Sequence, residues 1–528
     1  MGTRSDDLSA SQGRPVAMAQ GTGPAQWLAE HAAEGPPVFL GEEIPAATLA
    51  ALDRASMVSR TPGRVLVIHS PMDDPESVKK ALFWAIVQKT AERYAPAVVE
   101  RDSALRLYVG STTPGSEVRI RHTGQSRWRQ DVLPGVSLRL VHGPVDAVAH
   151  VNVGEARIPI ETPERLLLSL PLNFLRDPTD LVRLLVWLKS LVVARPALLE
   201  AYRAFPRPVV LKRIANLGRD VGNERLADLL DDVVATEQAV RISRARTGAG
   251  TTFVVPPQIA QLRSTRSPWL DRLRLLIQDS IAQTRRVLGG AQAPASRYDL
   301  AALLESAREG KAYDAYHSSS IEGYRLRLDE VSAFLAGSTD AGPGIENLKA
   351  RLAVAGYGDA FDALLARLAD QGGAIPLTPG LALDLYTDLF TPSIEAGLVE
   401  STALCRFREG PVFIRDTLYT PPNADKVPGM LDLLFDEIDA LPADEGYLKA
   451  TLVHLWFVWI HPFPDGNGRV ARFLMNTALL ADRRRWLTIR VEQRGPYFAA
   501  IKHAQTNEDS VPFARFIRGC IEESGRIT

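Results

Sequence analysis

An apolar helix that runs into a short loop of proline and glycine constrains this chain more than any other feature. Residues 451–460 (TLVHLWFVWI) form an apolar run long enough for a buried helix. Residues 461–468 (HPFPDGNG) form the loop, and a second helix is expected to begin at its end. Such a turn presents unpaired backbone N–H groups and the positive end of a helix dipole. The segment therefore predicts an anion-binding turn.

The residues that follow the loop suit phosphate. Gly466 and Gly468 would let phosphate oxygens approach the backbone closely. Arg469 and Arg472 lie three residues apart, so both can project from one face of the helix, and guanidinium forks match phosphate well. A surface turn with a capped helix would explain any one of these residues, but not all of them together.

Two further side chains add chemistry to this turn. Asp465 offers the hard oxygen ligand that Mg²⁺ prefers. His461 is the group here that can take a proton near neutral pH, although a lone histidine beside an apolar helix is more often structural. Together they predict proton transfer beside a metal-bound phosphate.

Residues 461–472 resemble the signature of the Fic family, HxFx(D/E)GNGRxxR, at every defined position. The resemblance implies transfer of AMP from ATP to a Ser, Thr or Tyr hydroxyl of a target protein, with His461 as general base and Asp465 as the Mg²⁺ ligand. The residues implied to hold the ATP phosphates are Gly466, Asn467, Gly468, Arg469 and Arg472. A kinase-like branch of the family has Lys where this chain has Gly468. Another nucleotide, or removal of AMP, stays open as an alternative reaction at the same site.

The resemblance extends to both sides of the signature. Downstream, Tyr497 falls where family members stack or bond near adenine, while Gln505 stands where Asn is usual. Upstream, residues 405–422 alternate like a β-hairpin and resemble the flap of the family. An exposed edge strand can pair with the main chain of a target, and the best candidates are Val412, Phe413 and Ile414. A plain hairpin packed on its own domain is the competing interpretation.

The segment Ser318-Ser-Ser-Ile-Glu322-Gly323 resembles the inhibitory motif of the family, (S/T)xxxE(G/N). Gly323 is suited to the left-handed residue that ends a helix, which places Glu322 at the helix end. A carboxylate there can make a two-pronged bond to a guanidinium, and the resemblance names Arg472 as the partner. We therefore expect an autoinhibited enzyme, although a solvated glutamate at a helix end would give the same short pattern.

The organisation along the chain predicts a mainly α protein. A C-terminal α-helical domain with a small β-hairpin flap follows an α+β N-terminal region that has room for a winged-helix head. The expected segments are a disordered lead (1–25), the N-terminal region (26–240), a linker (241–260), a helical region with the inhibitory motif (261–375) and the catalytic domain (376–523). Residues 64–70, 103–110, 117–122 and 137–143 are expected to be strands, and residues 75–94 a helix.

The N-terminal region faintly resembles AbiEi-type antitoxin regulators, which favours DNA as an alternative partner and a DNA-binding regulator with an ATP-sensing domain as the competing function. Basic residues gather locally at Arg119, Arg121, Arg127, Arg129, Lys212, Arg213 and Arg219. The whole chain of 528 residues is near neutral, with a net charge of -1, which favours a solvated face instead.

Two cysteines without a CxxC pair, no signal-peptide pattern and no apolar run long enough to span a bilayer predict a cytoplasmic protein without a membrane partner. The sequence leaves open a homodimer and does not identify the target protein.

Overall fold

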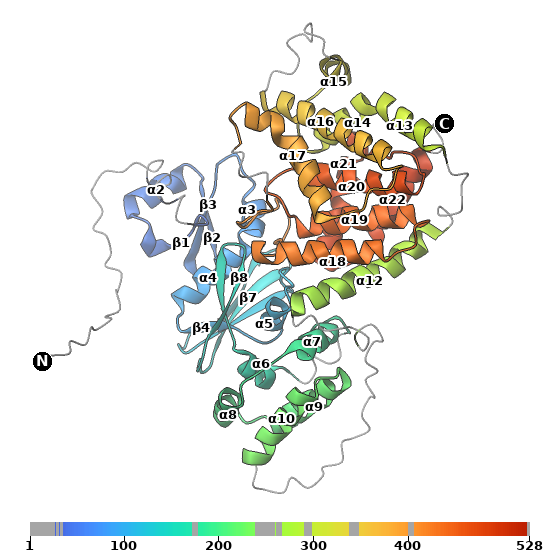
Figure 1. The fold of residues 1–528 in the computed structure, drawn as a ribbon. Coiled ribbons are helices and arrows are strands. Elements are labelled where there is room, and N and C mark those ends of the chain that lie inside the picture. The colour runs from blue at the N-terminus through green and yellow to red at the C-terminus, as the bar shows by residue number, and fades with distance from the viewer. Residues whose placement is uncertain are drawn as a thin grey trace, which may run out of the picture.

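The computed structural model describes residues 27, 31, 35–171, 178–237, 259, 267–289, 298–336, 348–399 and 406–524. The predicted lead (1–25) and, apart from Ile259, the predicted linker (241–260) lie outside these ranges. As predicted, the C-terminal half is helical and the N-terminal half combines sheets with helices (Figure 1). No helix in these ranges is both long and apolar enough to cross a membrane.

Two sheets build the N-terminal region. The first has the strand order β1-β3-β2, and the second has the order β6-β7-β5-β4-β9-β8. Helix α4 (Phe83–Arg93) contacts strands of both sheets and so joins them. The strands are β1 (Val38–Leu40), β2 (Val58–Thr61), β3 (Val65–Ile68), β4 (Ala97–Val99), β5 (Glu117–His122), β6 (Trp128–Leu133), β7 (Val136–His142), β8 (Ala149–Val153) and β9 (Ala156–Ile160). The first sheet, together with α2 (Ala46–Arg54), occupies the place predicted for a winged-helix head, which stays a prediction.

The prediction of a strand over residues 103–110 is wrong. This segment belongs to helix α5 (Arg101–Tyr108). The Glu161 carboxylate, 60 residues further along the chain, accepts a hydrogen bond of 2.9 Å from the Arg101 N–H in the first turn of this helix. That long-range cap is invisible in the local alternation of Leu105 and Leu107, which suits a strand equally well. The expected helix over residues 75–94 is present but breaks at Leu82, into α3 (Pro75–Ala81) and α4.

Helices follow the second sheet from residue 163 onward. They are α6 (Pro163–Ser169), α7 (Pro178–Ser190), α8 (Arg195–Ala204), α9 (Pro208–Asp220) and α10 (Glu224–Glu237). Their apolar faces join the core of the second sheet through residues such as Leu166, Leu188 and Leu211. Sheets and helices of the N-terminal region therefore share a large hydrophobic core.

The C-terminal helices pack around α19 (Gly446–Ile460), whose side chains are buried along almost its whole length. It contacts α12, α18, α20, α21 and α22, so the loop at its end is held from several sides. The helices are α12 (Pro268–Leu288), α13 (Leu300–Glu309), α14 (Lys311–Ile321), α15 (Leu328–Leu335), α16 (Leu348–Asp370), α17 (Pro379–Glu395), α18 (Val427–Asp439), α20 (Asn467–Ala481), α21 (Arg494–Asn507) and α22 (Val511–Ser524).

The flap, which we define as residues 406–423, does not form the expected hairpin. No strand and no ladder of paired backbone groups occurs within residues 406–423, and the short helix η6 (Ala424–Lys426) follows them. Three prolines in the segment lack the N–H that a ladder needs. The Arg408 guanidinium instead donates to two main-chain carbonyls of the segment, that of Gly410 at 3.1 Å and that of Pro422. The Arg408 side chain therefore takes the place of the backbone hydrogen bonds that would join the two strands of a hairpin.

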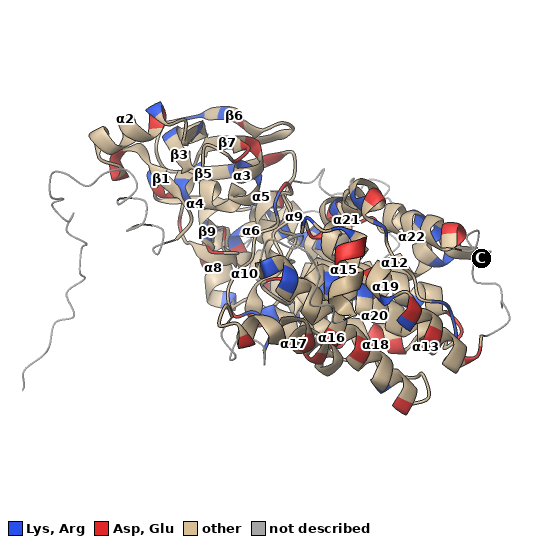
Figure 2. Cartoon of the chain, turned by 90° about the horizontal axis from the view of Figure 1, so that it is seen from above, with Lys and Arg blue, Asp and Glu red and all other residues tan. Residues whose placement is uncertain are grey.

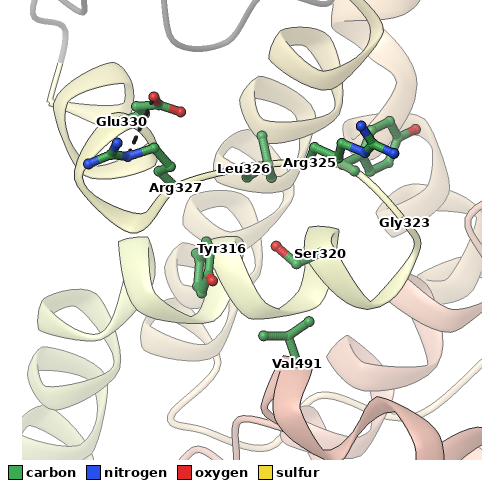
Figure 3. Close-up of a pocket in the computed structure, with 9 residues that line it drawn as sticks. Tyr316, Ser320, Gly323, Arg325, Leu326, Arg327, Glu330 and Val491 are labelled. Atoms are coloured by element: carbon green, nitrogen blue, oxygen red, sulfur yellow. Dashed lines mark ion pairs between the residues drawn. The ribbon is translucent and has the colours of Figure 1, made fainter.

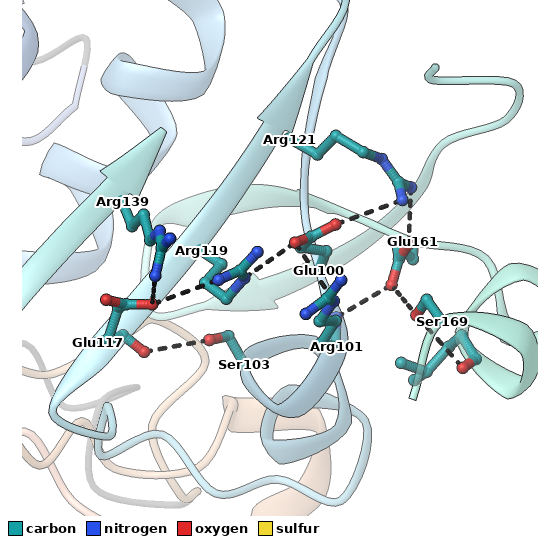
Figure 4. A network of polar contacts seen from close by, with 10 residues as sticks. Glu100, Arg101, Ser103, Glu117, Arg119, Arg121, Arg139, Glu161 and Ser169 are labelled. Atoms are coloured by element: carbon teal, nitrogen blue, oxygen red, sulfur yellow. Dashed lines mark hydrogen bonds and ion pairs between the residues drawn. The ribbon is translucent and has the colours of Figure 1, made fainter. Parts of the chain in front are cut away.

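Several arginines of the second sheet are paired with carboxylates of the same chain (Figure 4). Arg119 lies 2.9 Å from Glu100, and Arg121 lies 2.6 Å from Glu161. Positive and negative residues are interspersed over both halves of the chain in Figure 2. Outside the sheet, Arg219 at the end of one helix lies 2.7 Å from Asp231 of the next helix along the chain. Much of the local charge that favoured a DNA partner is thus neutralised by carboxylates of the same chain.

Glu508 links the two halves of the chain. It follows the end of α21, and its Oε1 accepts hydrogen bonds from Arg272 at 2.6 Å, Arg183 at 3.2 Å and Ser111 at 3.2 Å. Burial alone would raise the pKa of Glu508, but Arg272 and Arg183 outweigh it and lower this pKa to about 2. The interface therefore depends on an ionised carboxylate.

We predict that Glu508→Gln destabilises the chain in a pH-dependent way. The lowered pKa means that this carboxylate contributes its full stabilisation above pH 4.5, its ordinary value, and loses it as the pH falls through about 2. The unfolding free energy of the variant at pH 7 should be lower by up to about 3 kcal/mol, and the difference should shrink below pH 4.5. Denaturant titrations at pH 7 and at a pH below 4.5 measure the difference in unfolding free energy. The exposed substitution Glu523→Gln is the control. A difference that is the same at both pH values would contradict this account.

Candidate active site

His461 stands at the point where α19 ends. It adopts the left-handed conformation, with φ of 56° and ψ of 60°, while its N–H still bonds the carbonyl of Phe457 at 2.9 Å. Pro462 follows and disfavours continuation of the helix at His461. The imidazole Nδ1 lies 3.3 Å from the carbonyl oxygen of Val458. Nδ1 therefore carries the proton, and Nε2 keeps its lone pair.

The surroundings keep this imidazole neutral. Burial lowers the pKa of His461 to about 4, against the smaller opposing effect of the Val458 carbonyl, and the positive charge of Arg408 acts in the same direction as burial. At neutral pH the Nε2 atom is thus an available proton acceptor, which is the state that a general base requires.

Asn467 fixes the loop between the two helices. Its side-chain oxygen accepts from the Phe463 N–H at 2.9 Å, and its side-chain nitrogen donates to the Phe463 carbonyl at 2.8 Å. The Phe463 ring stacks on Tyr386 of α17, with centroids 3.9 Å apart and planes within 4°. Asn467 was predicted to hold phosphate through the turn. In this structure its side chain serves the loop itself, so only its backbone N–H faces the anion site.

Helix α20 begins with unpaired amides, as predicted. Gly466 precedes it in the left-handed conformation, with φ of 78°, and no side chain caps the first turn. The N–H groups of the first turn have no partner inside the helix. A Cβ on Gly466 would lie 2.8 Å from the Phe390 ring, so both the conformation and the space favour glycine here.

Arg469 brings a buried positive charge to the same turn. Its side chain is only 2% exposed, and its guanidinium lies 5.1 Å from the centroid of the Phe390 ring. Its Nη2 lies 3.6 Å from the exposed Asp465 carboxylate, whereas its buried Nε has no hydrogen-bond partner among the described residues. A buried guanidinium with an unused donor suits an anionic ligand.

Arg472 is the most fully engaged residue of the site. Its Nε donates to Ser318 Oγ at 2.8 Å, and its Nη2 donates to Ser318 O at 3.1 Å and to Glu322 Oε1 at 2.6 Å. Burial alone would lower the pKa of Arg472, but the Glu322 carboxylate outweighs it and raises this pKa. The predicted meeting of Glu322 and Arg472 is therefore present in the structure. It is a single hydrogen bond instead of the expected pair, because Ser318 takes the Nε donor and Tyr497 takes Nη1.

Gly468 leaves the space that the Glu322 carboxylate occupies. A Cβ on this glycine would lie 2.4 Å from Glu322 Oε1 and 3.2 Å from Arg472 Nη1. Glu322 itself caps α14, and Gly323 follows with φ of 101°. The carboxylate thus reaches over the first turn of α20, where the sequence predicts phosphate. An anion of the chain already sits at the predicted anion site.

The ring of Tyr497 is not exposed for stacking on adenine. It is 1% exposed, and its ring contacts those of His454, Phe498, Phe513 and Phe516. Its hydroxyl accepts from Arg472 Nη1 at 3.2 Å and lies 3.1 Å from His454 Nε2. Because its faces are packed, Tyr497 orients Arg472 and offers no surface for stacking a base.

The flap reaches the site through Arg408. The Arg408 Nε donates to the His461 carbonyl at 2.7 Å, and its backbone N–H donates to the Pro462 carbonyl at 2.9 Å. Of the predicted docking residues, Phe413 is 42% exposed, while Ile414 packs against the helical core. Val412 is half-buried. Arg408 was not predicted as a site residue; it belongs to a charged stretch with Arg406 and Glu409 directly before Gly410 and Pro411.

A pocket of about 520 Å³ lies on the outer side of the segment that carries Glu322 (Figure 3). Tyr316 and Ser320 of α14 line it, together with the turn from Gly323 to Arg327. The Arg494 Nε donates to the Ile321 carbonyl at 2.8 Å and anchors the end of α14. The segment with Glu322 is thus held at its helix end and open on its outer side.

The metal-binding capacity of the site rests on Asp465. No group of three or more His, Cys, Asp or Glu side chains that could hold a metal occurs in the described part of the chain. Asp465 is 69% exposed at the edge of the turn. A single carboxylate fits Mg²⁺ that takes its other ligands from substrate phosphates and water.

Comparison with known proteins relates the second half of the chain to one family. Residues 376–479 match the model described as Fic/DOC family, a range that includes His461, Asp465 and Arg472 but not Glu322. The protein adenylyltransferase Fic of Nematostella vectensis is 29% identical over 226 residues, which cover 42% of this chain and 49% of that protein. The protein of the same name from Drosophila grimshawi is 30% identical over 238 residues, covering 42% and 44%.

The chain spans about half the length of these curated relatives. Among solved structures, Fic-1 (residues 134–508) from C. elegans is 20% identical, with a TM-score of 0.37, and the match covers 63% of this chain and 91% of that one.

We predict that Tyr497→Phe destabilises the protein by about 1–3 kcal/mol, because the buried Arg472 Nη1 then lacks its acceptor. Chemical denaturation measures the change. Tyr313→Phe is the matched control, since Tyr313 is 42% exposed and should shift stability by less than about 0.5 kcal/mol. Equal stability of wild type and Tyr497→Phe would show that this hydroxyl does not support the guanidinium.

Proposed function

Because residues 376–479 form a Fic domain, we propose that this chain is a protein adenylyltransferase held in check by its own Glu322. The reaction transfers AMP from ATP to a Ser, Thr or Tyr hydroxyl of a target protein. The observation that carries the proposal is the juxtaposition of a neutral His461 with an uncapped helix start and two buried arginines.

The turn at the start of α20 would hold the triphosphate. Its amides lack partners inside the helix, and Arg469 retains an unused buried donor. Arg472 adds a second guanidinium from the same helical face. Backbone amides and guanidinium groups that are fixed before the substrate arrives stabilise the charge of a phosphoryl transfer without reorganisation.

His461 would act as the general base. The target hydroxyl oxygen attacks the α-phosphorus of ATP, and the bond between that phosphorus and the bridging oxygen to the β-phosphate breaks. Pyrophosphate leaves with the electron pair, and the hydroxyl proton passes to Nε2. The bond from Nδ1 to the Val458 carbonyl keeps the imidazole in the tautomer that can accept this proton.

Asp465 would hold Mg²⁺ together with the phosphates. Its exposed carboxylate lies beside the helix start, and one protein ligand suits a metal that keeps water and phosphate oxygens. When bound, the ion would neutralise part of the negative charge of the phosphates.

Glu322 would act as the brake by occupying the phosphate position on Arg472. Its Oε1 lies 2.6 Å from Arg472 Nη2 and directly above Gly468, where a phosphate oxygen would otherwise approach the backbone. Two anions cannot share this place without strong repulsion. ATP would therefore lose its productive pose while the carboxylate stays in position.

We predict that Glu322→Gly raises the modification of the protein itself by labelled ATP by about tenfold to a hundredfold. The estimate follows from the roughly 1.5–3 kcal/mol of a hydrogen bond between charged groups. Glu309→Gly, at the exposed end of α13, is the control and should leave labelling unchanged. His461→Ala in the Glu322→Gly protein should abolish labelling. Equal labelling of wild type and Glu322→Gly would refute the brake.

We also predict the pH dependence of the released enzyme. A general base works in its neutral form, and the pKa of His461 is lowered to about 4. The rate of the Glu322→Gly protein should therefore stay level as the pH falls through 6.5 and decline only near pH 4 or below, because the Glu322 charge, which raises this pKa, is removed. Steady-state labelling at a series of pH values measures the profile. An inflection near pH 6.5, the ordinary histidine value, would mean that the base is another group or that His461 is solvated.

A further inference from the structure

The flap lies against the N-terminal region as well as against the helices. The Thr112 hydroxyl donates to the Thr420 carbonyl at 2.6 Å, and the Ser77 hydroxyl bonds the Asp416 carboxylate. Leu418 packs against the core of the second sheet. The N-terminal region therefore fixes the position of a segment that belongs to the catalytic half.

Strand β8 also lies beside the flap. It is an edge strand of the six-stranded sheet. The Asn423 side-chain nitrogen donates to the carbonyl of Asn152 in β8 at 2.8 Å. At the adjoining turn, a Cβ on Gly154 would lie 3.5 Å from the Phe413 ring, in ordinary contact. The edge of β8 thus lies beside the segment predicted to dock a target.

The register of β8 leaves main-chain groups pointing outward. Val153 pairs with Ala156 across a two-residue turn, so alternate residues of β8 exchange hydrogen bonds with β9. Asn152 turns its carbonyl to Asn423, away from β9, and His150, two residues earlier, has the same orientation. Pro159 stands opposite His150 in a non-hydrogen-bonded pair, where a main-chain N–H would point away from β8, so a proline fits this position. His150 therefore presents its N–H and C=O at the open edge.

A groove separates this edge from the flap. It has a volume of about 400 Å³, with Val151, Asn152 and Gly154 on one wall and residues 409–411 on the other. The β8 wall is the edge of a strand, which can pair with the main chain of an extended peptide, while the flap wall is irregular and bends at residues 409 and 410. Charged residues near its end carry both signs, since Lys426 lies 2.8 Å from Asp425.

The groove adjoins the catalytic residue. The Arg408 side chain donates both to the carbonyl of Gly410, in the groove wall, and to the carbonyl of His461. A chain that enters the groove therefore lies next to the loop that holds the imidazole.

We propose that an extended segment of the target protein docks in this groove and pairs with the edge of β8, so that the N-terminal region takes part in choosing the target. The inference rests on the proposed function, because the occupant is the polypeptide that receives AMP. The flap supplies one wall, and His150, next to Val151 of the other wall, supplies the main-chain partners, because the Asn152 carbonyl already accepts from Asn423.

The test uses the full-length Glu322→Gly protein and a library of short fluorescent peptides, each with one central Ser, Thr or Tyr. Binding is measured by fluorescence polarisation, and AMP transfer by mass spectrometry of the peptides. His150→Pro removes the outward N–H at an edge position where proline is tolerated, whereas His150→Ala keeps it. The proline variant should bind the best peptide about tenfold more weakly, and the alanine variant should bind as the parent does.

Asn152→Arg, which fills the groove from an exposed position, should weaken binding similarly and decides the question if His150→Pro unfolds. Undiminished peptide binding by both variants, or no peptide bound by the parent, overturns the groove. The proposed function fails by a different result: the parent transfers no AMP to any peptide or to itself, whether or not peptides bind.

Discussion

The buried guanidinium of Arg472 is the group on which the site depends. It crosses from α20 to α14, with donors directed to Ser318, Tyr497 and Glu322. A positive charge at this depth is costly unless an anion accompanies it. The neutral acceptors can hold the guanidinium in place, but only Glu322 supplies the negative charge. In the proposed mechanism an incoming phosphate would supply this negative charge instead, so the Glu322 carboxylate would compete with the substrate for Arg472.

Several other features follow from this one contact. Gly468 has to be a glycine for the carboxylate to reach the arginine, and the same space suits a phosphate oxygen. Glu322 sits at the end of α14 with a side chain that is 27% exposed, and its carboxylate bonds Arg472 Nη2. A second buried ion pair, around Glu508 at the C-terminal end of α21, joins the two halves of the chain. Tyr497 lies on that same helix, which connects the interface to the guanidinium.

The sequence predicts the parts of this arrangement that are local. The apolar run before His461, the helix that starts after Gly466 and the left-handed Gly323 are all where the pattern places them. The meeting of Glu322 and Arg472, 150 residues apart, was predicted only through a family resemblance. What local patterns could not predict depends on distant partners. Glu161 caps α5 and turns an expected strand into a helix, and Arg408 replaces the ladder of an expected hairpin. Tyr497 was expected to face a nucleotide, but aromatic neighbours from α19 and α22 cover its ring.

The most direct test of the account is a crystal structure of the Glu322→Gly protein with ATP and Mg²⁺. The account predicts that an oxygen of the γ-phosphate takes the place of the missing carboxylate, within hydrogen-bonding distance of Arg472 Nη2 and above Gly468. A triphosphate bound elsewhere, with Arg472 still held only by Ser318 and Tyr497, would contradict it.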